Sequence, residues 1–193
     1  MFIGFPEDIA RQRWYGVGEN LRDWATRLFA FSGPIVDFNP GCNKKQLKSK
    51  LGYREDKKLV VGTVGGTRIG KDLLEKLSCS YSLLREHNIQ LVLVCGPRID
   101  PAEIKVDPEV KKYGYVHNLD EHLFVADCVI SQTSLSTLGE IRWLNITSMI
   151  APIGKHYEQL SLAKHFQERE NITGISLDEL VREEDVLMNY NCN

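Results

Sequence analysis

The chain has 193 residues, of which 42% are apolar and 26% are charged, so it is long enough for one domain with a sizeable core. Its formal net charge of −2 gives no basic footprint, which argues against a nucleic-acid-binding protein. No apolar run has the length of a membrane span, and the first ten residues lack the pattern of a signal peptide.

Residues 1–57 show mixed patterns before any strand is predicted. The pattern of 20–31 predicts an amphipathic helix with aromatic residues on one side, 32–41 reads as extended, and 43–52 predicts a polar helix ending at Gly52. The aromatic residues of this region predict a surface that packs against this domain or against a partner. We therefore predict a linker or crossover segment at 1–57, followed by a domain at 58–193.

From residue 58 onward, short runs rich in β-branched residues alternate with helical patterns. The predicted strands are 58–64, 90–96, 107–116 (at its end), 127–132, 147–153 and 171–177. The predicted helices are 69–87, 119–126, 134–144, 156–170 and 178–190. This alternation predicts an α/β fold of the Rossmann-like, doubly wound type, with a mostly parallel sheet covered on both faces.

The five cysteines stand far apart and form no C-x-x-C pair. Cys79, Cys95 and Cys128 fall within apolar runs, so we expect buried free thiols in a reducing compartment, which favours a cytoplasmic protein. No pair of histidines has metal-ligand spacing, and we expect no metal site. His117 and His122 are expected to be solvated surface residues.

The stretch GGTRIGKD, 65–72, matches the register of a P-loop, G-x-x-x-x-G-K. A P-loop continues with a Ser or Thr that binds Mg²⁺, whereas this chain has Asp72. A carboxylate there would repel the phosphates. The stretch therefore predicts a glycine-rich phosphate-binding turn, with an NTPase as a disfavoured alternative.

Ligands of open parallel sheets bind beyond the carboxyl ends of the strands, and several polar loops are predicted there. The candidate residues on these loops are Gly65, Gly66, Arg98, Tyr115, Ser134, Leu135, Ser136, Glu140, His156, Glu158 and Gln159. Each also has an ordinary structural explanation: hydroxyls before a helix usually cap it, and Arg98 and Glu140 could simply be solvated. Their convergence on one edge is what favours a binding site.

The order of several motifs resembles the C-terminal, nucleotide-sugar-binding domain of GT-B glycosyltransferases, especially the MurG-like family. The matching stretches are IGFPEDI (3–9), RDW (22–24), GPIVDFNP (33–40), LG (51–52), VGTVGGTRIG (61–70), GPRIDP (96–101), YVHNLDEHLFVAD (115–127), TSLSTLGE (133–140) and HYEQ (156–159). The resemblance covers most of the chain.

The resemblance implies a donor site for a nucleotide-sugar of the UDP-sugar class, with no metal and no other cofactor. Gly65, Gly66 and Thr67 would lie near the diphosphate, which Ser134, Leu135 and Ser136 would also approach. Tyr115 and Val116 would border the base, and Glu140 would bind the ribose. His156, Glu158 and Gln159 would lie at the sugar.

The resemblance also implies that this chain carries no catalytic base. That base belongs to an N-terminal acceptor-binding half, so we expect the chain to be a fragment or one subunit of a split enzyme, inactive alone. The acceptor could be lipid-linked, and the partner half could bring the chain to a membrane. Thr133 and Ser134 replace two family glycines, which keeps open a degenerate, non-catalytic subunit. Half of a nucleotide-sugar epimerase is a further alternative.

Overall fold

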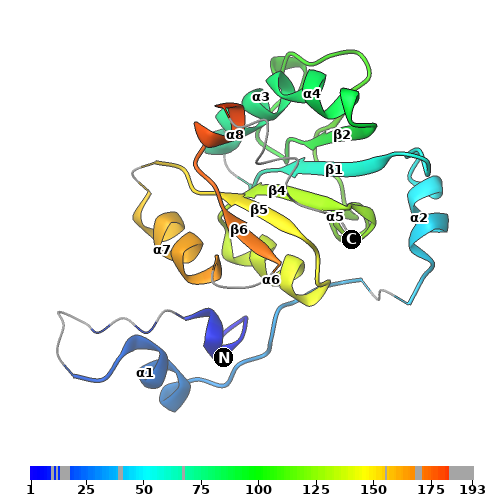
Figure 1. The fold of residues 1–193 in the computed structure, drawn as a ribbon. Helices are drawn as coiled ribbons and strands as arrows, with labels where there is room; N and C mark the ends of the chain where they lie inside the picture. Colours follow the sequence, from blue (N-terminus) through cyan, green and yellow to red (C-terminus); the bar gives the residue numbers. More distant parts are fainter. Residues whose placement is uncertain are drawn as a thin grey trace.

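A computed structural model describes residues 1–9, 11, 13, 18–38, 41–66, 68–154, 156–167 and 171–182. Its centre is a six-stranded parallel sheet in the order β3-β2-β1-β4-β5-β6 (Figure 1). The strands are β1 (Lys58–Thr63), β2 (Ile89–Val94), β3 (Lys111–Tyr113), β4 (Cys128–Gln132), β5 (Ser148–Ala151) and β6 (Ile172–Gly174). This order is that of a doubly wound nucleotide-binding fold, which confirms the predicted fold class.

Helices cover both faces of the sheet. They are α2 (Lys44–Lys50), α3 (Lys71–Cys79), α4 (Tyr81–Glu86), α5 (Leu119–Val125), α6 (Leu135–Trp143), α7 (Tyr157–Phe166) and α8 (Glu179–Arg182). Helix α1 (Leu21–Leu28) belongs to neither core, and short 3₁₀ turns lie at Pro6–Asp8, Arg68–Gly70 and Pro101–Glu103. One core lies between the sheet and α3, α4 and α8, and the second lies between the sheet and α2, α5, α6 and α7. Strand β1 supplies both cores because its side chains alternate between the two faces.

Several predicted elements change in the structure. The predicted helix 69–87 is two helices, α3 and α4, which meet at Ser80, whose hydroxyl donates to the Lys76 carbonyl oxygen at 3.2 Å. A hydroxyl bonded back to the preceding turn competes with regular helix geometry. The predicted strand within 107–116 is reduced to Lys111–Tyr113, and α8 is described only to Arg182 of the predicted helix 178–190.

Two predictions about burial were wrong. Cys79 is exposed at the end of α3, whereas Cys95 and Cys128 are buried as expected. His122 is buried on α5, where its Nδ1 lies 2.5 Å from the Tyr53 hydroxyl. Burial lowers the pKa of His122, because desolvation penalises the imidazolium.

The N-terminal residues pack beside α6 and α7. Figure 1 shows α1 and the N-terminus together, next to the part of the sheet domain that carries these helices. The Asp8 carboxylate accepts from Arg142 Nη1 at 2.6 Å, and the Arg142 guanidinium lies 4.3 Å from the Phe5 ring centroid. This contact holds residues 1–9 against α6. Trp24 and Phe29 form an edge-to-face pair and remain exposed.

Candidate donor-binding site

A cavity of about 490 Å³ opens at the carboxyl edge of the sheet, where β1, β2 and β4 end. Its described lining residues are Thr63, Val64, Gly65, Gly66, Ile69, Val94, Gly96, Pro97, Tyr115, Val116, Leu119, Gln132, Thr133, Ser134, Leu135, Ser136, Thr137, Glu140, His156, Glu158 and Gln159. The structure thus brings together all predicted site residues except two. Thr67 lies outside the described residues, and Arg98 is exposed and does not line the cavity.

Unpaired polar atoms concentrate at this cavity. Six buried side-chain atoms of the described residues have no hydrogen-bond partner: Thr63 Oγ1, Ser131 Oγ, Gln132 Oε1, Thr133 Oγ1, Glu140 Oε2 and His156 Nδ1. All of these residues except Ser131 line the cavity. Because folded proteins pair nearly all buried polar groups, such a cluster indicates groups that await a ligand or water.

Glu140 is more buried than an ordinary helix-surface glutamate. It lies on the second turn of α6, and burial raises its pKa to about 7, with a smaller contribution from the negative charge of Asp120. The residue is half-buried and its Oε2 is fully buried without a partner, which does not fit a freely solvated helix-surface side chain. A carboxyl group that is costly to ionise gains from a ligand that donates hydrogen bonds to its charged form.

The N-terminus of α6 points toward the cavity, where its first residues are among the lining residues. Ser134 is the N-cap: its Oγ accepts from Thr137 N at 3.4 Å and lies 3.0 Å from Thr137 Oγ1. The capping role expected of such a hydroxyl is thus present. The helix end still adds positive partial charge to this side of the cavity, which favours an anion there.

The loop after β5 forms another wall. Gln159 is buried, and its Oε1 accepts from Ile153 N at 3.0 Å, so it fixes the path of the loop. His156 precedes α7 and leaves its buried Nδ1 unpaired, while Glu158 is exposed at the start of the helix. Of the three residues predicted to contact the sugar, Gln159 thus already uses its Oε1 in a hydrogen bond to the backbone.

The loop after β3 supplies an aromatic edge. Tyr115 is 62% exposed and packs edge-to-face on His117, with ring centroids 4.9 Å apart. Val116 is half-buried and packs against the core beneath α5 and α6. An exposed ring beside a backbone segment is an arrangement that can border a flat base.

The cations of the P-loop-like stretch are engaged elsewhere. Lys71 Nζ lies 3.2 Å from Glu103 Oε2, and Arg68 pairs with the same carboxylate. These two cations lower the pKa of Glu103. Neither cation lines the cavity, and the described lining residues include no lysine or arginine. The arrangement thus lacks the phosphate-facing lysine of a P-loop.

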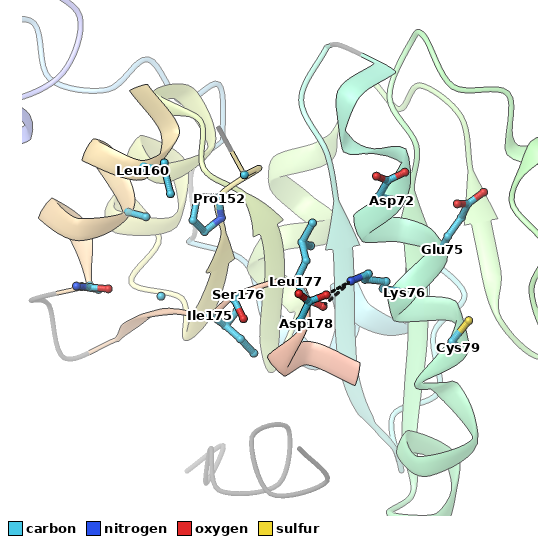
Figure 2. A pocket seen from close by; sticks show the side chains of 14 residues that line it. Asp72, Glu75, Lys76, Cys79, Pro152, Leu160, Ile175, Ser176, Leu177 and Asp178 are labelled. Atoms are coloured by element: carbon cyan, nitrogen blue, oxygen red, sulfur yellow. Dashed lines mark hydrogen bonds and ion pairs between the residues drawn. The ribbon is translucent and has the colours of Figure 1, made fainter. Parts of the chain in front are cut away.

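A second and larger cavity, of about 690 Å³, lies between α3, α7 and the β6–α8 connection (Figure 2). It contains none of the predicted site residues, and none of the six unpaired buried atoms belongs to its described lining. Its Lys76 is already paired with Asp178 at 2.8 Å, as the dashed line in Figure 2 shows. The unpaired atoms therefore favour the smaller cavity as the ligand site.

Sequence reasoning missed two residues of the site that have unpaired polar atoms, Thr63 and Gln132. Both are buried at the ends of strands, β1 and β4, and both have an unpaired atom. The available signal was a polar residue closing an apolar run at the carboxyl end of a strand. Among the described residues, no group of three or more potential metal ligands was found, and no helix has the length and hydropathy of a membrane span.

Comparison with known proteins identifies the family. The family model of the glycosyltransferase family 28 C-terminal domain matches residues 60–186. This chain belongs to that family. The match confirms the glycosyltransferase resemblance seen in the sequence motifs.

Curated relatives align at low identity. A UDP-N-acetylglucosamine–N-acetylmuramyl-(pentapeptide) pyrophosphoryl-undecaprenol N-acetylglucosamine transferase of Thermoanaerobacter sp. is 26% identical over 117 residues, which cover 56% of this chain and 32% of the relative. A processive diacylglycerol beta-glucosyltransferase of Bacillus pumilus is 27% identical over 115 residues, covering 56% of this chain and 29% of the relative. The chain thus spans about a third of the length of these relatives.

Solved glycosyltransferases share the fold. The calicheamicin glycosyltransferase CalG4 superposes with a TM-score of 0.62 at 15% identity, covering 89% of this chain and 40% of CalG4. The spinosyn rhamnosyltransferase SpnG superposes with a TM-score of 0.61 at 13% identity, covering 83% of this chain and 44% of SpnG. This family 28 domain therefore has the fold of one part of longer glycosyltransferases.

Proposed function

We propose that this chain binds a nucleotide-sugar, of the UDP-sugar class, in the cavity at the carboxyl edge of the sheet. The observation that carries the proposal is the cluster of buried polar atoms without partners around that cavity, including Glu140 Oε2 and His156 Nδ1. A relative of similar sequence is named for a UDP-N-acetylglucosamine substrate, which supports the choice of nucleotide.

In this proposal the nucleotide lies across the ends of β1, β2 and β4. The base borders Tyr115 and Val116, and the ribose hydroxyls donate to Glu140. The diphosphate faces the Gly65–Gly66 turn and the N-terminus of α6. Because the described lining residues include no lysine or arginine, backbone amides and the helix dipole stabilise the diphosphate charge, with no metal ion assigned to the site.

The proposed reaction is direct displacement of the nucleoside diphosphate at the anomeric carbon of the sugar. This chain contributes donor binding and stabilisation of the leaving diphosphate as negative charge grows on it. The base that activates the acceptor belongs to an N-terminal acceptor-binding domain or subunit, which the chain needs for activity. The acceptor class we propose is lipid-linked, since one curated relative described above is named for a pyrophosphoryl-undecaprenol acceptor and the other for the lipid diacylglycerol.

Calorimetric titration of the chain with UDP, with ATP and NAD as controls, tests the donor site. We expect UDP to bind with a dissociation constant in the micromolar to millimolar range, and Glu140→Ala to weaken binding by about 1–3 kcal/mol through loss of a charge-assisted hydrogen bond. Equal binding of ATP or NAD contradicts the nucleotide assignment, and unchanged affinity in the variant contradicts the ribose assignment.

A non-catalytic assembly subunit is the second candidate. Thr133 and Ser134 carry side chains where related loops have two glycines, and both line the cavity. If these side chains block the diphosphate, the wild-type chain binds no UDP, whereas Thr133→Gly/Ser134→Gly gains UDP binding. That pair of results supports the second candidate over the first.

A further inference from the structure

The glycines of the turn after β1 leave room for one side chain from another strand. A Cβ atom added at Gly65 would lie 2.7 Å from Gln132 Nε2, and one added at Gly70 would lie 2.9 Å from Gln132 Oε1. Both distances are below the 3.0 Å that real Cβ contacts respect. The two glycines that match the P-loop register thus leave space for the nitrogen and the oxygen of the Gln132 carboxamide. At Gly70 the side chain of Val64 also fills the space, at 2.4 Å.

Gln132 is placed to hold this turn. It is the last residue of β4, only 4% exposed, and it lines the donor cavity. Its buried Oε1 has no partner among the described residues, and it lies beside Gly70, the N-cap of α3. That helix has no side-chain cap, so its first amides also lack a side-chain acceptor. An unpaired acceptor therefore lies beside the start of a helix that no side chain caps.

We propose that Gln132 is a positioning residue for the diphosphate part of the donor site, an inference that rests on the proposed function. Its carboxamide lies against both Gly65 and Gly70 and so fixes the distance between the 65–70 turn and the end of β4. The amides of Gly65 and Gly66 then face the same space as the N-terminus of α6. With a diphosphate bound, an amide at the start of α3 donates to the Gln132 Oε1.

The first test compares UDP with uridine, which lacks the diphosphate. Gln132→Met keeps the length of the side chain and removes the carboxamide. We expect this variant to bind uridine as the wild type does and to bind UDP about tenfold more weakly, the effect of losing one hydrogen bond between neutral groups that positions the turn. Melting temperatures of the two proteins, measured in parallel, show whether the variant is folded.

The outcomes separate this inference from the function on which it rests. A wild-type chain that binds neither UDP nor uridine refutes the proposed function and this inference with it. A wild-type chain that binds UDP, together with a Gln132→Met variant whose ratio of UDP to uridine affinity is unchanged, refutes the inference alone. Equal loss of both ligands in the variant also refutes it, because a general structural defect does not discriminate the diphosphate.

A double-mutant cycle tests the contact itself. The φ angle of Gly65 is outside the left-handed region, so alanine is limited there only by the space that Gln132 occupies. Gly65→Ala should weaken UDP binding about tenfold in the wild type and have little further effect in Gln132→Ala, because the smaller side chain frees that space. If the losses in UDP affinity caused by Gly65→Ala and Gln132→Ala are additive in the double variant, the proposed contact between the two residues is refuted. Gly66→Ala is the matched control for folding, since nothing lies within 4 Å of its added Cβ and its melting temperature should not change.

Discussion

The raised pKa of Glu140 predicts that nucleoside binding depends on pH through one carboxyl group. Burial and the nearby charge of Asp120 bring its pKa to about 7, so the Glu140 carboxyl group is partly protonated at neutral pH when no ligand is bound. Ribose hydroxyls donate to a carboxylate and bind its ionised form more tightly. The ionised fraction falls from roughly 0.9 at pH 8 to roughly 0.1 at pH 6, so affinity should fall about tenfold over this interval, or ~1.4 kcal/mol.

Uridine is the better ligand for this assay, because a terminal phosphate titrates near pH 6 and would add its own slope. Calorimetry at pH 6, 7 and 8 compares the wild type with Glu140→Gln, which keeps the shape and cannot ionise. The variant should bind with a constant affinity over the whole range. A flat profile in the wild type, or an equal slope in both proteins, refutes the reasoning.

The raised pKa of Glu140 also makes the stability of the folded chain depend on pH. The folded pKa of Glu140 is above the unfolded value of 4.5, so the folded chain binds the proton more tightly. This contribution to stability is fully present below pH 4.5 and is lost as the pH rises through about 7. Glu140→Gln should therefore stabilise the chain more at pH 8 than at pH 5, measured as the difference in urea midpoint from the wild type. A difference that is constant over pH contradicts the assignment.

Three further predictions concern the scaffold. Burial lowers the pKa of His122, so the stability that this residue contributes is present above its unfolded pKa of 6.5 and is lost as the pH falls. Tyr53→Phe should lower the free energy of unfolding in urea by about 1–3 kcal/mol at pH 8, because it leaves the buried Nδ1 of His122 without its partner. Asp8→Ala should release the N-terminal residues from α6 and speed their cleavage in limited proteolysis, while Arg27→Ala, which breaks an exposed pair, should not. Leu74→Ala should cost about 2–5 kcal/mol in urea unfolding, since the side chain is fully buried beneath α3, and a smaller loss would contradict the packing of that core.

The sequence by itself determined the fold class and the edge of the sheet at which the site lies. Parallel strands buried on both faces read as near-continuous apolar runs, as in β1, β2 and β4, and their alternation with helical periods is visible within short windows. The loops that follow these strands must meet at one edge. Gly65, Ser134 and Glu140 could therefore be grouped from the sequence before any contact was known.

Only the tertiary structure decided which of these residues are buried, paired or free. Gln132 fills the space of two glycines more than sixty residues earlier in the chain, Tyr53 covers His122, and the second turn of α6 buries Glu140. Arg98, by contrast, follows a strand of the same sheet, yet it is exposed and does not line the cavity. Each of these outcomes depends on contacts between segments that are distant in the sequence, and local hydrophobic periodicity does not predict such contacts. Desolvation by those segments is what shifts the pKa of a carboxyl or an imidazole group.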